Sequence, residues 1–119
     1  MSKESIAKIE STFLGVEDHG IFTAMLYVNY GSSGQGIGQY ALDSYNESTK
    51  QRHGTAYGME WIRRVLQATG AESWEKVAGR TILVIHENDG WNSKVIGIKP
   101  LPTEKGKEFL FDSLKGYNE

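Results

Sequence analysis

The sequence contains no cysteine and only two prolines among its 119 residues. Without cysteine, disulfide bridges and thiolate metal sites are excluded, and residence in the cytosol is the simplest expectation. No apolar run is long enough for a secretory signal or for a helix that crosses a membrane. These absences predict a soluble intracellular protein with no membrane partner.

A broad cationic surface is also missing, because the formal net charge is −2. Domains that bind duplex DNA usually need such a surface to displace counterions, so nucleic acid is an improbable partner. The charge nevertheless varies along the chain. Residues 50–80 hold six basic residues against three acidic ones, whereas residues 1–49 hold two against six. The central stretch is therefore the only cationic part of the sequence.

The length predicts a single domain over residues 1–119, since two halves of this size would each bury too little surface to be stable. The composition is that of an ordinary globular protein, with 14 glycines as its one excess. That excess indicates many tight turns, and the small core leaves room for one modest pocket.

Periodicity and turn signals divide the chain into hairpins and helices. The sequence predicts strands over 7–16, 21–30 and 37–42, an exposed loop over 43–51, helices over 55–69 and 74–78, strands over 81–87 and 94–98, and a helix after Thr103. We therefore expect an α+β fold. Its antiparallel sheet is built from N- and C-terminal hairpins, with two central helices and a possible C-terminal helix on one face.

A glycine-rich stretch, residues 31–38, holds the first candidate binding residues, Gly34, Gln35 and Gly36. It is not a dinucleotide fingerprint, because Gln39 stands where the third glycine would be. One interpretation is a hairpin connection that needs positive φ. The other is a nest of backbone amides for phosphate.

The second interpretation gains weight from Arg52, His53 and Thr55, which come just before the predicted central helix. Free amides and the positive end of the dipole attract anions at a helix N-terminus. The two signals support each other only if the glycine stretch and this helix start meet in space.

The central helix adds Tyr57, Trp61, Arg63 and Arg64 as candidate binding residues. Arginines on a polar helical face are most often solvated or paired with a nearby acid, here Glu60. One of the two could instead lean toward a ligand or a second chain, because adjacent residues are separated by ~100° around a helix.

Aromatic residues offer further surfaces for packing or stacking. Tyr57 and Trp61 are typical of a core or a subunit interface, and less often stack on a nucleobase. Rings near the glycine stretch could come from Tyr27, Tyr30 and Tyr40. Three tryptophans and six tyrosines are many for one small core, so we expect a homo-oligomer, with the helix around Trp61 as its interface.

No catalytic or metal-binding pattern is visible in the sequence. The three histidines lack the spacing of a metal signature, and His86 and Glu87 on a strand point to opposite faces. No serine stands in a nucleophile elbow. The sequence thus predicts a binding protein that is not an enzyme and uses no metal or cofactor.

Four segments carry a resemblance to a known group: residues 8–20 (KIESTFLGVEDHG), 34–36 (GQG), 54–64 (GTAYGMEWIRR) and 72–75 (ESWE). They resemble small phage-encoded proteins, and most of all the anti-Thoeris sponges that sequester cyclic ADP-ribose-type immune signals. The similarity runs over about residues 8–98, and residues 100–119 match no pattern of the family.

This resemblance implies an α+β protein of the host cytoplasm that assembles as a dimer or a hexamer of dimers. Pockets near the protomer interfaces would bind a cyclic nucleotide without cleaving it, and a second chain could supply a missing wall. Two other functions remain open. One is inhibition of a host defence enzyme through Trp61, Trp74 or Trp91, and the other is a single-stranded nucleic-acid accessory role.

Overall fold

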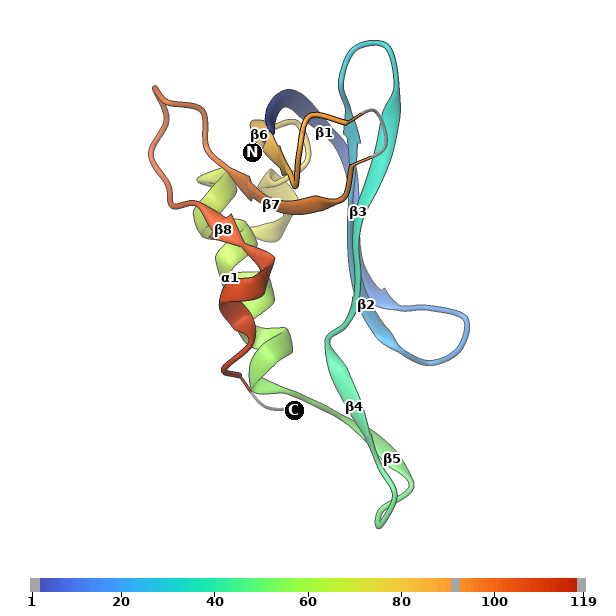
Figure 1. The fold of residues 1–119 in the computed structure, drawn as a ribbon. Coiled ribbons are helices and arrows are strands. Elements are labelled where there is room, and N and C mark those ends of the chain that lie inside the picture. Colours follow the sequence, from blue (N-terminus) through green and yellow to red (C-terminus); the bar gives the residue numbers. More distant parts are fainter. Residues whose placement is uncertain (1–2, 91–92, 118–119) are drawn as a thin grey trace.

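A computed structural model describes residues 3–90 and 93–117 and shows a six-stranded antiparallel sheet (Figure 1). The strands are β1 (Lys3–Val16), β2 (Phe22–Asn29), β3 (Gly34–Ala41), β6 (Thr81–His86), β7 (Val95–Lys99) and β8 (Phe109–Leu110). Their order across the sheet is β3-β2-β1-β6-β7-β8. The long β1 joins the two halves, because it pairs with β2 on one side and with β6 on the other.

Two shorter strands, β4 (Asp43–Asn46) and β5 (Gln51–Gly54), form a separate hairpin that extends away from the sheet (Figure 1). It is closed at its tip by Asn46, whose side chain accepts from the backbone N–H groups of Ser48 and Thr49. Lys50 there adopts a positive φ of 58°. The hairpin leads directly into the helix α1 (Ala56–Thr69).

The ends of α1 follow from local sequence chemistry. The Thr55 hydroxyl oxygen accepts from Gly58 N at 2.9 Å and donates to Leu42 O at 2.9 Å, which caps the helix and ties it to the end of β3. Gly70 ends the helix in a left-handed conformation. Two short 3₁₀ turns follow, η1 (Trp74–Lys76) and η2 (Phe111–Leu114).

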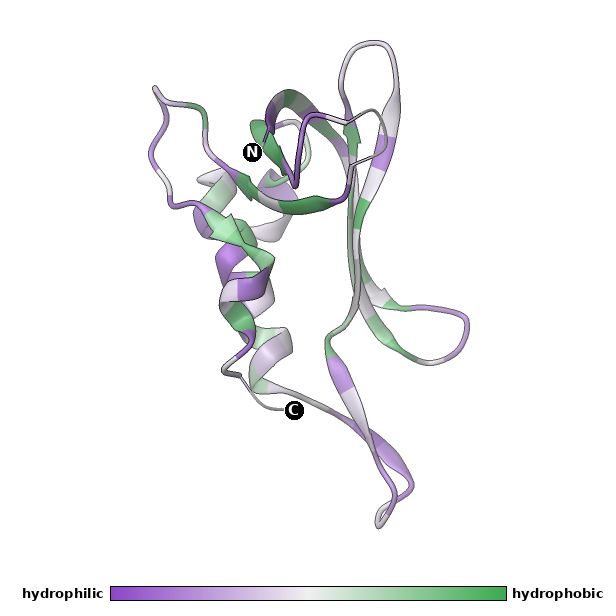
Figure 2. Cartoon of the chain, viewed as in Figure 1, coloured by the Kyte–Doolittle hydropathy of each residue, from purple (hydrophilic) through white to green (hydrophobic). Residues whose placement is uncertain are grey.

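The core lies between α1 and one face of the sheet. Trp61 is fully buried there, and its ring meets Phe109 edge-on at a centroid distance of 6.1 Å. Alternate residues of the strands supply the other wall, with Ile9, Leu26 and Ile82 at 0% exposure. In Figure 2 the hydrophobic colour follows β6 and β7, whereas β5 is hydrophilic.

The predicted hairpins are confirmed, since β1 pairs with β2 and β6 with β7, both antiparallel. The α+β prediction was wrong, because the chain is mostly β: 44% is strand and 19% helical, with a single α-helix among the described residues. The predicted second helix is the 3₁₀ turn η1. The expected C-terminal helix is strand β8 followed by η2.

Two further expectations need correction. The polar segment 43–51, predicted as a loop, forms β4, a turn and the first residue of β5. The glycine-rich stretch is mainly strand rather than turn, because β3 begins at Gly34 and pairs with β2 as far as Ala41. Within the described residues, no helix is both long and apolar enough to span a membrane.

Candidate functional site

The best candidate site is a polar groove at the end of the sheet where the β2–β3 turn meets the start of β1 and the end of β6. We call it the turn groove. Its volume is about 830 Å³, within the range of roughly 300 to 1,000 Å³ typical of small-molecule clefts. The residues that line it are Lys3, Ser5, Ile6, Tyr30, Ser32, Ser33, Gly34, Gln35, His86, Gly90 and Ser93.

Tyr30 is the organising side chain of the turn groove. Its hydroxyl donates to Gln35 Oε1 at 2.6 Å, and its backbone N–H donates to Ser33 O at 2.8 Å. Its ring lies 5.9 Å from the His86 ring at an angle of 43°. Burial raises the pKa of Tyr30, which further favours the protonated phenol that donates this hydrogen bond.

The positive charge of the turn groove comes from its β1 side. Lys3 is the register partner of His86, and the His86 ring in turn lies 5.9 Å from the Tyr30 ring, so a lysine, an imidazole and a phenol line the same groove. A cation, an aromatic ring, an amide and several hydroxyls can together bind a phosphate, stack on a base and hydrogen-bond a sugar. The turn groove thus suits a nucleotide-like ligand.

The loop between β6 and β7 closes another side of the turn groove. The Asn88 side-chain oxygen accepts from Gly90 N at 2.8 Å, and the Asn88 backbone carbonyl oxygen accepts from the Ser93 hydroxyl at 2.8 Å. These bonds fix Gly90 and Ser93 at the lining. Trp91, which the sequence offered as an interface anchor, lies outside the described residues.

Of the residues predicted to bind, Gly34 and Gln35 line the turn groove. Gly36 lies one step further along β3 on the face of the sheet that α1 does not cover. A Cβ placed there would come within 2.6 Å of the Met25 methyl and 3.7 Å of the Tyr27 ring. Among the three expected tyrosines, Tyr30 enters the turn groove and Tyr27 does not, while the side chain of Tyr40 lies outside what is described.

Arg52 and His53 belong to β5 in the protruding hairpin, away from the turn groove at the other end of the elongated molecule (Figure 1). Arg52 donates from Nε and Nη2 to the two carboxylate oxygens of Asp43, at 3.0 and 2.8 Å. The hydrogen bonds from Arg52 lower the pKa of the Asp43 carboxyl. This guanidinium is therefore engaged within its own hairpin.

Thr55, Tyr57 and Trp61 contribute to packing in the structure. Thr55 is the buried cap of α1, and Tyr57 packs half-buried against the core. Trp61 has no exposed surface, so it offers nothing to a ligand or a second chain in this conformation. The interface expected around Trp61 has no support from its position, and Trp74 is likewise partly buried against the core.

Arg63 and Arg64 share one acid, Glu60, as the first interpretation of this helical face anticipated. Arg63 Nη1 lies 2.9 Å and Arg64 Nε 3.0 Å from Glu60 Oε2. Hydrogen bonds from Arg64 and then from Arg63 lower the pKa of Glu60. Arg64 also donates to Ser113 Oγ at 2.9 Å and lies over the Tyr117 ring, which joins the C-terminal segment to α1.

The ten predicted residues therefore fall into separate places: the start of β3, the protruding hairpin, and α1. The turn groove unites two of them with residues that sequence reasoning did not select, among them Lys3, Ser93 and His86. Lys3 and His86 are distant in sequence and meet only because β1 pairs with β6. The described residues contain no group of three or more side chains placed to hold a metal ion.

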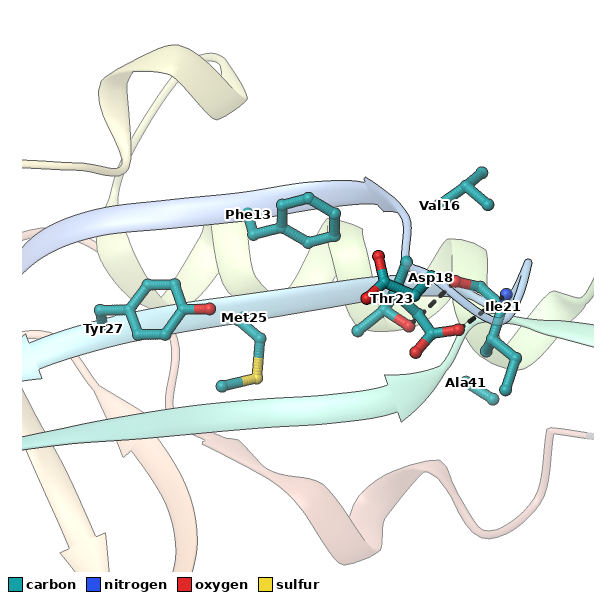
Figure 3. A pocket seen from close by; sticks show the side chains of 9 residues that line it. Phe13, Val16, Asp18, Ile21, Thr23, Met25, Tyr27 and Ala41 are labelled. Atoms are coloured by element: carbon teal, nitrogen blue, oxygen red, sulfur yellow. Dashed lines mark hydrogen bonds between the residues drawn. The ribbon is translucent and has the colours of Figure 1, made fainter.

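A second groove lies on the open face of the sheet, the face that α1 leaves uncovered, and Figure 3 shows it from close by. We call it the face groove. Its volume is about 510 Å³, and it is lined by Phe13, Val16, Glu17, Asp18, Ile21, Thr23, Met25, Tyr27 and Ala41. Most of its lining residues are apolar or aromatic, but Thr23 and the two acids Glu17 and Asp18 make part of its surface polar. Its chemistry is thus distinct from that of the turn groove.

Comparison with protein-family models, curated proteins and solved structures finds no match to this chain.

Proposed function

We propose that this chain binds a small phosphorylated nucleotide in the turn groove and holds it without cleaving it. In its most specific form, the proposal is that the chain acts as a phage sponge in the host cytoplasm, which sequesters a cyclic ADP-ribose-type immune signal. The resemblance of four sequence segments supports that form. The observation that carries the proposal is the meeting of the Tyr30 ring, the Gln35 amide and the Lys3 ammonium around a groove of about 830 Å³.

Each lining group has a role that matches one part of such a ligand. Lys3 offers charge-assisted hydrogen bonds to a phosphate, and His86 adds a further polar contact beside it. The half-buried Tyr30 ring can stack on a base, and Gln35, fixed by the Tyr30 hydroxyl, can read a base edge.

A sponge acts stoichiometrically, so it must bind tightly. Nanomolar binding corresponds to about −12 kcal/mol. One lysine and one ring do not reach that value alone, since charge-assisted contacts contribute roughly 1.5 to 3 kcal/mol each. Several contacts from the lining would have to act together.

The first test is isothermal titration of the protein with cyclic ADP-ribose and its isomers, beside a thermal melt. We expect a melting temperature that rises with ligand, because binding to the folded state adds RT ln(1 + [L]/Kd) of stability. Lys3→Glu should weaken binding by about 10- to 150-fold. Lys50→Glu, an equal charge reversal at the tip of the β4–β5 hairpin, is the matched control and should leave affinity unchanged.

The opposite pattern contradicts the assignment. If Lys3→Glu and the native chain bound the ligand with equal affinity, the ligand would not bind in the turn groove. If Arg52→Glu or Arg63→Glu lost affinity instead, the ligand site would lie on the β4–β5 hairpin or on α1, as the sequence predicted. Absence of heat and of a melting shift with every isomer would refute the nucleotide proposal, and a shift with a single-stranded oligonucleotide alone would favour the accessory role.

Intact release is the second test. Ligand bound, then freed by heat denaturation and analysed by mass spectrometry, should be chemically unchanged at any incubation time. A linear or hydrolysed product that accumulates with time would identify an enzyme.

A further inference from the structure

The open face of the sheet carries a ridge next to a hollow. Tyr27 on β2 is 43% exposed and Phe13 on β1 is 39% exposed, both on the face that α1 does not cover. Beyond Phe13 and Met25, toward the β1–β2 turn, the face groove opens over Thr23 and Ala41 (Figure 3). Thr23 is one of the residues that line this groove, and the groove's volume of about 510 Å³ is enough for a side chain from outside.

Glycine keeps the neighbouring edge of this face flat. Gly36 and Gly38 on β3 are the register partners of Tyr27 and Met25. A Cβ at Gly36 would crowd the Met25 methyl at 2.6 Å, and Gly38 has a φ of 124° that other residues rarely adopt. β3 therefore adds no side chain of its own at Gly36 and Gly38, and the Met25 side chain and the Tyr27 ring lie over Gly36 instead.

The rows of paired residues place ridge and hollow symmetrically. Phe13 pairs with Met25, the row before it pairs Ser11 with Tyr27, and the row after it includes Thr23. Suppose that two copies face each other and are related by a two-fold axis that runs across the strands at the Phe13 row. Each row on one side of Phe13 in one copy then faces the row on the other side of Phe13 in its partner. This arrangement sets the Tyr27 ring of one copy over the Thr23 hollow of the other, and the reverse.

Charge is arranged about the same row. Lys8 and Asp18 are both exposed. Lys8 pairs with Asn29 on one side of the Phe13 row, and Asp18 lies on the other side, in the turn between β1 and β2. Neither makes an ion pair within the described part of the chain. The same two-fold axis brings Lys8 of one copy toward Asp18 of the other. If the strands of the two copies ran parallel instead, Lys8 would face Lys8 and Asp18 would face Asp18.

We propose that the occupant of the face groove is a second copy of this chain, packed face to face and antiparallel about the Phe13 row. Such an interface is isologous, because each copy presents the same ridge, hollow and pair of charges. It closes as a dimer and leaves the turn groove accessible at both ends. It also replaces the interface expected on the Trp61 helix, and it does not depend on the ligand proposal.

Sedimentation equilibrium over a concentration series tests this proposal. The native chain should approach twice the 13.3 kDa mass of one chain. Tyr27→Ala should raise the dimer dissociation constant by about tenfold or more, since an aromatic anchor leaves its pocket. Tyr45→Ala is the matched control, because Tyr45 is 48% exposed on β4, away from the face groove, and should leave the constant unchanged.

Charge reversal tests the antiparallel register. Lys8→Glu alone and Asp18→Lys alone should each weaken the dimer, and the double variant should recover the native dissociation constant. A native chain that stays at 13.3 kDa at every concentration overturns the proposal, as does equal loss for Tyr27→Ala and Tyr45→Ala. Failure of the double variant to recover affinity overturns the antiparallel arrangement. Circular dichroism of each variant confirms that it is folded.

Discussion

Replacement of Gly58 by alanine should destabilise this protein, although the same change in an ordinary helix stabilises it by about 1 kcal/mol. Gly58 lies in the first turn of α1 and is buried against the end of β3. A Cβ there would lie 2.7 Å from Leu42 C, 2.8 Å from Leu42 Cα and closer still to Leu42 O. All three atoms are backbone, so no side chain can turn aside to make room.

The loss of stability can be worked out from the hydrogen bonds that the Leu42 backbone makes. Its carbonyl accepts the Thr55 hydroxyl at 2.9 Å, and its N–H donates to Phe22 O at 2.8 Å. To admit a methyl group, the helix must shift away from this strand end. Overpacking typically costs 1 to 3 kcal/mol, and loss of one hydrogen bond adds about 1 kcal/mol. After the helix-propensity gain is subtracted, we expect a net loss of about 1 to 3 kcal/mol.

Urea unfolding followed by circular dichroism measures this difference. Gly58→Ala should lower the midpoint at an unchanged slope. Gly54→Ala is the control, since a Cβ at Gly54 meets nothing within 4 Å and its φ is not in the positive range. If Gly58→Ala proved as stable as the native chain, the close contact between α1 and β3 would be refuted.

Three further predictions concern the contacts around α1 and the protruding hairpin. Thr55→Ala removes the cap of α1 and should lower the free energy of unfolding by about 1 to 2 kcal/mol, measured by the same urea assay. Because Arg52 lowers the folded-state pKa of Asp43, that carboxylate stabilises the fold above its unfolded pKa, and this stability is lost as pH falls through the folded value. Asp43→Asn should therefore lower the melting temperature at pH 7 and flatten its decline between about pH 5 and pH 2, which a series of thermal melts will show. Arg64→Ala should speed proteolytic cleavage after residue 110 without altering the sheet, whereas Arg63→Ala, a change at an exposed ion pair, should shift stability by less than about 1 kcal/mol.

The sequence predicts the parts of this fold whose signals are local. Gly20 and the Asp89-Gly90 pair mark the two confirmed hairpins, and Thr55 and Gly70 mark the ends of α1. These signals work because a turn or a cap needs a particular residue at one position.

The β4–β5 hairpin escaped prediction because it extends from the body. Its strands bury neither face fully, so their residues show no apolar alternation. What stabilises them is the backbone ladder, the Asn46 turn and the Asp43–Arg52 ion pair. The assignment of helix to residues 103–114 failed for a related reason, since the apolar spacing there serves strand β8 and the 3₁₀ turn η2 against α1.

Only part of the candidate site could be predicted from the sequence, for a different reason. Gly34, Gln35 and Tyr30 are close in sequence, so the glycine-rich stretch pointed to them. Lys3 and His86 join them only through strand pairing between distant segments, which no local pattern encodes. Arg52 and Arg64 drew attention as cations, yet each has a carboxylate partner. Arg64 pairs with Glu60 on its own helix, which the sequence allowed for, whereas Arg52 meets Asp43 only because β4 pairs with β5.

The position of β1 at the centre of the sheet has a consequence for how the chain folds. Its second half pairs with the neighbouring β2, so this hairpin can form early, within microseconds. Its first half pairs only with β6, whose register joins Lys3 to His86. Until β6 arrives, that half of β1 has an unsatisfied edge, and the search for its partner must close a loop of most of the chain. Folding should therefore proceed in two stages, with the turn groove, which needs both segments, completed in the second.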